Sequence, residues 1–371
     1  RARLGEVLAR SPRRRVSLVD RTFVTLAIVM LSDRTQAPHA VVTGASGYLG
    51  RHLVAALETR GWRVTRCLRD AGGAPNAVSV PDLDERSLAA IPWPADTVFH
   101  LAGLAHRFPP NVPSDAEFER VNAHGAGAVA RAAKGRARRF VFASSIAAIG
   151  VRGEPPCTAY GRSKLQGEHA VKDALAGSTT DAVILRFPAI YGFGAPGAVS
   201  QLARWILRGR PLPSCARTTR RSMIAIENAV DACIFAAESA RLAGRTAVPA
   251  DRETLSVLDA ATTIARGGGT RVRTIPIPRI ALSFLGTIGA RCGITAMASA
   301  ERLLESTEIT DATLAEIADW IPPTSAQHAL AALGAASARE ASHPQASDPQ
   351  ASDPQASDPR ASDPRASERV A

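Results

Sequence analysis

The chain has 371 residues, is 46% hydrophobic and carries a formal net charge of +11. This composition is enough for one large core or two smaller ones. Nearly all of the positive charge is arginine, spread along the chain without a dense basic stripe, which argues against a nucleic-acid partner.

The five cysteines are scattered, are odd in number and include no C-x-x-C pair. This pattern indicates neither a metal site nor a disulfide framework, and it favours a reducing, cytoplasmic location. The longest apolar run near the start, residues 23–31, is far shorter than the ~20 residues of a membrane span. We therefore expect no transmembrane segment.

The two ends of the chain differ from its middle. Residues 1–37 form an Arg-rich, poorly patterned N-terminal extension. From Gln345 the chain repeats a short unit, ASDPQ or ASDPR, which has proline in every copy and almost no large apolar side chain. Such a repeat cannot bury a core, so we expect residues 340–371 to be a disordered tail.

From residue 38 onward, short apolar runs alternate with segments of helical spacing. The runs that read as strands are 39–43, 62–68, 77–80, 96–102, 138–145 and 181–187. The segments that read as helices are 48–61, 118–135 and 159–177, followed later by 199–208 and 228–240. Apolar strands that alternate with helices indicate βαβ units and a parallel sheet covered on both faces.

The predicted fold class is therefore α/β, with a doubly wound parallel sheet of the Rossmann type and a smaller C-terminal substrate lobe. We expect residues 38–195 to form an NAD(P)-binding domain and residues 196–335 to form the substrate-binding lobe. Sheets of this kind bind ligands at the carboxyl ends of their strands.

The stretch AVVTGASGYLG places Gly44, Gly47 and Gly50 between the first strand and the first helix. Gly44 would permit the tight turn, Gly47 the close approach of a pyrophosphate, and Gly50 close packing of helix on strand. Backbone N–H groups at the helix start, at Tyr48 and Leu49, would face the phosphates. Because the spacing differs from the commoner G-x-G-x-x-G, a plain packing turn is the alternative.

The second strand ends in CLRD, where a dinucleotide site usually has an acidic residue for the adenosine ribose. Asp70 could take that role, whereas Arg69 could instead meet a 2′-phosphate and favour NADP. Both are otherwise solvated loop charges. After the third and fourth strands, two further pairs could border the cofactor: Asp82 with Leu83, and Ala102 with Gly103.

The motif AYGRSK places Tyr160 and Lys164 four residues apart, on one face of a predicted helix. A nearby ammonium favours the phenolate, so this tyrosine can exchange a proton with a hydroxyl while hydride moves at the same carbon. Ser145, at the end of the fifth strand, is expected to hold the substrate oxygen. Ser144 is the second candidate for substrate binding.

The order TGASGYLG, HLAG, VN, FASSI, YGRSK and LRFPAIYG resembles the extended short-chain dehydrogenase/reductase family, over about residues 39–330. The later stretch GRPLPSCARTTRRSMIAIENAVDA resembles its nucleotide-sugar branch, the bacterial NAD-dependent epimerase/dehydratases of surface-polysaccharide synthesis. The resemblance implies NAD or NADP as cofactor, with Pro188 beside the nicotinamide. It also implies a nucleotide-activated sugar as substrate, Arg221 as a diphosphate contact, and a homodimer through the helices at 121–133 and 160–176.

Three departures from that family pattern stand out. The interval from Ser145 to Tyr160 is short, which could misplace the serine against the tyrosine. Ala189 stands where many UDP-sugar epimerases have asparagine, and AIEN replaces the more usual strand ending. The last two weaken a UDP-hexose assignment without touching the cofactor site.

Three functions remain open from the sequence. The first expectation is a UDP-glucose 4-epimerase-like enzyme that acts at C4 of a UDP-hexose or amino sugar by hydride transfer to bound NAD and back. The second is an NADPH-dependent 4-ketoreductase of a nucleotide 4-keto-6-deoxy sugar, which Arg69 and Ala189 favour. The third is a nucleotide-binding protein without catalysis.

Overall fold

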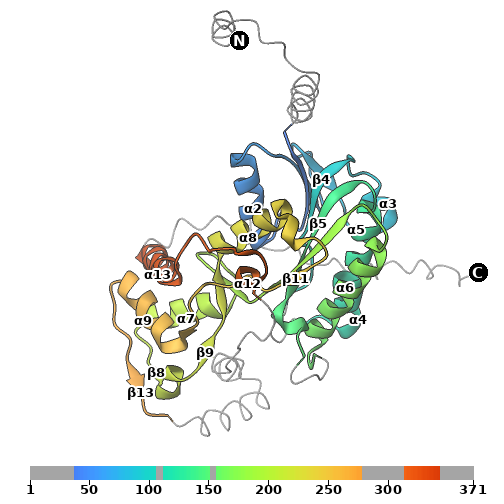
Figure 1. Ribbon diagram of the computed structural model, residues 1–371. Helices are drawn as coiled ribbons and strands as arrows, with labels where there is room; N and C mark the ends of the chain where they lie inside the picture. The colour runs from blue at the N-terminus through green and yellow to red at the C-terminus, as the bar shows by residue number, and fades with distance from the viewer. Residues whose placement is uncertain (1–36, 106–111, 151–155, 278–312, 343–371) are drawn as a thin grey trace, which may run out of the picture.

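The computed structural model describes residues 37–105, 112–150, 156–277 and 313–342 (Figure 1). The expected N-terminal extension and the repeat tail lie almost wholly outside these residues. Within them, a seven-stranded sheet forms the centre, in the order β11-β6-β5-β4-β1-β2-β3. Its strands are β1 (His39–Thr43), β2 (Arg63–Leu68), β3 (Ala77–Ser79), β4 (Ala95–His100), β5 (Ala137–Ser145), β6 (Asp181–Phe187) and β11 (Thr246–Ala247).

Every neighbouring pair in this sheet is parallel, as the alternating pattern predicts. The strands are apolar because the sheet is covered on both sides: all five residues of β1 are buried. The six predicted strands are confirmed, and β11 is an additional one. It is only two residues long, and its pairing with Ile184 and Leu185 of β6 depends on the folded chain rather than on a local pattern.

Helices cover both faces of the sheet (Figure 1). The helices that the structure describes are α2 (Tyr48–Thr59), α3 (Glu85–Leu88), α4 (Asp115–Phe118), α5 (Gly125–Ala133), α6 (Ala159–Leu175), α7 (Ala198–Leu207), α8 (Ile226–Glu238), α9 (Val257–Gly267), α12 (Leu314–Ala318) and α13 (Ala326–Ser342). One core packs α2 and α8 against the sheet, and a second packs α3, α5 and α6 against the other face. The predicted helix at 118–135 is interrupted by a π-helical segment, Glu119–His124.

A third core belongs to the smaller lobe, where α7, α9 and α13 pack together. Short two-stranded pairs complete the lobe: β7 (Ala189–Tyr191) with β10 (Met223–Ala225), β9 (Arg220–Arg221) with β12 (Leu255–Ser256), and β8 (Leu212–Pro213) with β13 (Thr274–Ile275). The boundary expected at residue 195 stays a prediction, and the chain beyond it does not remain in the smaller lobe. The chain returns to the main sheet with α8, β11 and α12, because the apolar sides of α8 and α12 pack into the same core as α2.

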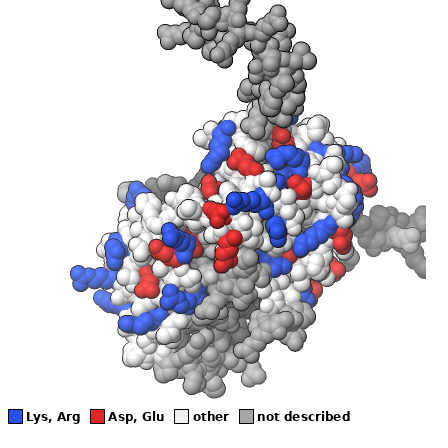
Figure 2. Space-filling model, viewed as in Figure 1, with Lys and Arg blue, Asp and Glu red and all other residues white. Residues whose placement is uncertain are grey.

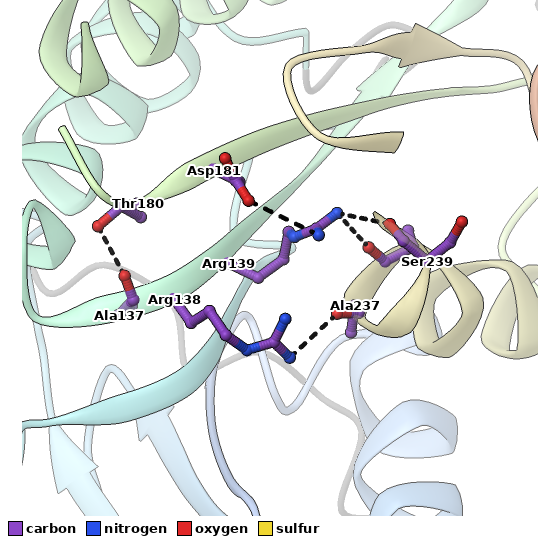
Figure 3. Close-up of polar contacts among 8 residues, drawn as sticks. Ala137, Arg138, Arg139, Thr180, Asp181, Ala237 and Ser239 are labelled. Carbon is purple, nitrogen blue, oxygen red and sulfur yellow. Dashed lines mark hydrogen bonds and ion pairs between the residues drawn. The ribbon is translucent and has the colours of Figure 1, made fainter. Parts of the chain in front are cut away.

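Two neighbouring arginines of β5 hold the carboxyl end of α8 (Figure 3). The Arg139 guanidinium is 2% exposed and donates to the carbonyl oxygens of Ala236 at 3.2 Å and Ser239 at 3.0 Å. It also lies 3.8 Å from the Asp181 carboxylate. Arg138, which is exposed, reaches only the Ala237 carbonyl, at 3.5 Å. A buried cation at a helix carboxyl end satisfies unpaired carbonyls and complements the helix dipole.

The surface charge is mixed on the face that Figure 2 draws, where Lys and Arg alternate with Asp and Glu. This agrees with the absence of a basic stripe in the sequence. None of the described helices is long and apolar enough to cross a membrane. The same residues contain no group of three His, Cys, Asp or Glu side chains that could hold a metal ion.

Candidate active site

The glycine turn lies at the carboxyl end of β1 and opens α2. Gly44 has φ +70°, and a Cβ at this position would lie 2.6 Å from the Ala102 backbone nitrogen. A Cβ at Gly50 would overlap the Gly44 carbonyl oxygen. Both positions therefore require glycine, the first for the turn and the second for close packing of helix on strand.

This turn borders a cavity of about 1430 Å³ at the carboxyl ends of β1, β2 and β4. The sequence-predicted residues that line it are Gly44, Gly47, Arg69, Asp82, Leu83, Ala102 and Gly103. A cavity of this size, with glycine backbone on one wall and a helix N-terminus above it, fits a nicotinamide dinucleotide. The plain packing-turn alternative accounts for Gly50 but not for the cavity.

Six predicted cofactor residues are not among those that line this cavity: Tyr48, Leu49, Gly50, Tyr160, Lys164 and Pro188. Leu49 is buried in the core, and Gly50 packs α2 on β1. The Tyr48 hydroxyl donates to the Phe193 carbonyl oxygen at 3.2 Å. Tyr48 therefore links the glycine turn to the loop after β7.

The end of β2 separates the two candidate ribose contacts. Arg69 lines the cavity, whereas the Asp70 carboxylate accepts a hydrogen bond from the Gly72 N–H at 2.9 Å and does not line the cavity. Asp70 thus stabilises the turn of its own loop. Of the two candidates, Arg69 is the one that lines the cavity, which Asp82, Asp84 and Glu85 also line.

Tyr160 lies in the first turn of α6, and its hydroxyl is hydrogen-bonded to the Ser145 side chain. Its ring packs edge-on against Phe118, with centroids 5.9 Å apart. Burial raises the pKa of the Tyr160 hydroxyl, and the hydrogen bond with Ser145 opposes that rise. The short interval between the two residues therefore does not separate them, contrary to the concern that the sequence raises.

Lys164 follows one turn later and is 6% exposed. Its ammonium donates to the Ala143 carbonyl oxygen at 2.8 Å and lies 5.1 Å from the centroid of the Phe142 ring. Burial lowers the pKa of Lys164 to about 8, and the nearby Glu168 carboxylate opposes this. A Cβ added to Gly103 would lie 3.3 Å from the Lys164 Nζ, so the lysine sits directly beneath the cavity wall.

Asn122 has a role here that the sequence did not predict. It lies in the π-helical segment, is 1% exposed, and its amide exchanges hydrogen bonds with the Leu104 backbone N–H at 2.8 Å and carbonyl at 3.1 Å. It also donates to the Ser163 hydroxyl at 3.0 Å. A π-helical turn often marks a functional position, and here it places Asn122 between the cavity wall and α6. In the sequence, the VN dipeptide contributed only to the family resemblance. It did not predict the π-helical turn.

Ser144 has a different partner from Ser145. Its hydroxyl is buried and donates to the Glu168 carboxylate of α6 at 2.5 Å, whereas the Ser145 side chain is bonded to Tyr160. A contact of Ser144 with substrate stays a prediction.

The remaining predicted residues lie toward the smaller lobe. Pro188 is buried between β6 and β7, and Ala189, which follows it, is exposed. Arg221 is half-buried on β9, where its strand pairs with Leu255. Their contacts with cofactor or substrate stay predictions.

The model of the NAD dependent epimerase/dehydratase family matches residues 40–248, more than half of the chain. The chain belongs to this family. The matched span holds the glycine turn, Ser145, Tyr160, Lys164 and Arg221. Membership makes the chain an NAD(P)-dependent enzyme, and the non-catalytic alternative is not supported.

Among curated relatives, the chain is 38% identical over 197 residues to a ceramide reductase of Caulobacter vibrioides, over 51% of this chain and 57% of that protein. The match thus spans little more than half of that relative. The present chain is also 25% identical over 318 residues to a UDP-glucose 4-epimerase of Vibrio cholerae, over 80% of this chain and 94% of that one.

Among solved structures, the UDP-N-acetylglucosamine 4-epimerase from Bacillus cereus superposes with a TM-score of 0.61 at 19% identity, over 80% of this chain and 98% of that one. At this identity the likeness supports the fold, with its parallel sheet and flanking helices. The predicted fold class is confirmed.

Proposed function

We propose that the protein is an NADPH-dependent ketoreductase. The reaction type is that of the second function that the sequence left open, but the proposed substrate is an apolar ketone and not a nucleotide 4-keto-6-deoxy sugar. The observation that carries the proposal is the end of β2, where Arg69 faces the cofactor cavity and Asp70 is bonded into its own loop. A guanidinium at this point binds a 2′-phosphate, whereas a carboxylate would repel it. NADPH suits an enzyme that consumes reductant, while an epimerase that returns its hydride has no need of it.

Each of the site residues has a separate role in ketone reduction. The bound dinucleotide supplies the hydride that reaches the carbonyl carbon. The Ser145 hydroxyl holds the carbonyl oxygen, and Tyr160 donates its phenolic proton to that oxygen as negative charge develops. The Lys164 ammonium stabilises the phenolate that is left.

Two observations favour an apolar ketone over a nucleotide sugar. Ala189 is exposed at the start of β7, and Phe193 in the following loop is 48% exposed. The hydrogen bond from Tyr48 to Phe193 holds this loop beside the glycine turn. An exposed methyl group and an exposed phenyl group thus lie on β7 and on the loop that follows it, and the relative at 38% identity is named a ceramide reductase.

A second candidate is the nucleotide-sugar 4-epimerase of the first expectation, with Arg221 as the diphosphate contact. The observation in its favour is the match to the Vibrio cholerae epimerase, which extends over 94% of that protein. A role in surface-polysaccharide synthesis, a cytoplasmic location and a homodimer also stay predictions.

One assay separates the two candidates. The purified protein is incubated with NADPH and a keto form of ceramide in detergent, and in parallel with UDP-glucose and NAD. The proposal expects consumption of NADPH with formation of the alcohol in the first reaction only. Formation of UDP-galactose without net change in cofactor would instead establish the epimerase.

A further inference from the structure

A buried ionic cluster lies directly behind the proton-transfer residues. Glu168, one turn after Lys164 on α6, is 0% exposed. Its carboxylate accepts hydrogen bonds from the Arg186 guanidinium at 2.8 Å and 2.6 Å, and a third from the Ser144 hydroxyl at 2.5 Å. The Arg186 side chain is 15% exposed. Three elements of the sheet layer, α6, β5 and β6, thus meet at one carboxylate.

This arrangement fixes the carboxylate more firmly than an isolated ion pair would. The guanidinium binds both carboxylate oxygens in a fork, which sets the plane of the group as well as its position. The serine hydroxyl holds one oxygen from the adjacent strand. Glu168 consequently has no freedom to turn away from Lys164, which lies one helical turn before it on the same face.

The groups around Lys164 show what the carboxylate contributes. His100 of β4 is fully buried, and burial lowers its pKa to about 3, so it is neutral. Asn122 from the π-helical segment is polar but uncharged, and Tyr160 on α6 is a phenol at neutral pH. Arg186 on β6 adds positive charge. In the part of the chain that the structure describes, Glu168 is the negative charge that offsets the burial of Lys164.

We propose that Glu168 is a positioning residue for proton transfer: held by Ser144 and Arg186, its carboxylate keeps Lys164 charged beside Tyr160. The inference rests on the proposed function only in taking Tyr160 and Lys164 as the proton-transfer pair. It gives Ser144 a role through Glu168, beside the contact with substrate that the sequence suggested.

The composition of the chain makes a direct test possible. Its lysines are Lys134, Lys164 and Lys172, so protein labelled with ¹³C and ¹⁵N at lysine gives few side-chain signals. Lys164→Arg identifies the Lys164 signal by its loss. A pH titration of that signal then reports the charge of Lys164 without substrate, so the result does not depend on which reaction the enzyme catalyses.

In Glu168→Gln we expect Lys164 to titrate at least about one pH unit lower than in the wild type, because removal of a nearby opposite charge disfavours the ammonium. Asp251→Asn is the matched control. Asp251 is a buried carboxylate of the smaller lobe, bonded to Tyr191 and Asn228, and its loss should leave the Lys164 titration unchanged. An unshifted Lys164 in folded Glu168→Gln overturns the proposal.

If Glu168→Gln does not fold, Glu168→Asp provides the test. The shorter side chain keeps the charge but draws it away from its partners, and Lys164 must still titrate below the wild-type value. An unchanged titration in this variant would equally overturn the proposal. Where turnover is measurable, the pH at which ketone reduction declines should fall together with the Lys164 titration while KM for the ketone stays constant. A purely structural role would lower turnover at every pH without moving that point.

Discussion

At the scale of single residues, the account depends most on the Tyr160 hydroxyl. Tyr160→Phe removes the proton donor and leaves the ring against Phe118. We expect turnover to fall by roughly 10²–10⁴-fold, the contribution of general acid catalysis, while the Kd for NADPH stays close to that of the wild type. Steady-state kinetics and cofactor titration measure the two quantities. Turnover that survived this substitution would remove Tyr160 from the mechanism.

The serines show what the sequence could settle at this scale and what it could not. The Tyr160–Lys164 spacing predicted a shared helix face, and that prediction needed only the helical period. Ser144 and Ser145 are adjacent, so the sequence could not tell which of them meets Tyr160. In the fold, Ser145 is bonded to Tyr160 and Ser144 to Glu168. Glu168 went unnoticed because its partners come from two other elements, β5 and β6.

At the scale of elements, α8 depends on a cation from β5. Arg139→Ala removes two hydrogen bonds to carbonyl oxygens at the end of the helix and leaves a gap beneath it. We expect the free energy of unfolding to fall by about 2–4 kcal/mol. Arg138→Ala is the control: this side chain is exposed and reaches one carbonyl at 3.5 Å, so its loss should cost about 0.5 kcal/mol or less. Equal losses in denaturant unfolding would contradict the assigned role of Arg139.

The long periodic elements could be predicted because the apolar pattern that stabilises them is visible in the local sequence. The six strands and the helices of the sheet layers carry their apolar pattern locally. The two-residue strands of the smaller lobe have no such pattern, because their pairing is set by distant partners such as Arg221 with Leu255. The break in the predicted helix at 118–135 also lacks a local signal, since the π-helical turn contains neither proline nor glycine.

At the scale of the whole molecule, residues that follow α7, the first helix of the smaller lobe, complete the sheet domain. Helix α8 covers one face of the sheet, and β11 extends its edge beyond β6. We expect a fragment of residues 38–195 not to fold, because it exposes the apolar face that α8 covers. A fragment of residues 37–342, which keeps α8, β11 and α12, should fold and bind cofactor. Near-ultraviolet circular dichroism compares the two fragments, and a folded shorter fragment would support the boundary that the sequence suggested.

The most direct measurement of the central claim is the affinity of the purified protein for NADPH and NADH, in the wild type and in Arg69→Ala. The account predicts that the wild type binds NADPH at least about tenfold more tightly than NADH, since a guanidinium–phosphate contact is worth about 1.4 kcal/mol or more. It predicts that Arg69→Ala loses this preference while its affinity for NADH stays nearly constant. Freshly purified protein that retains NAD near one per chain and does not exchange it for NADPH would contradict the reductase and favour the epimerase.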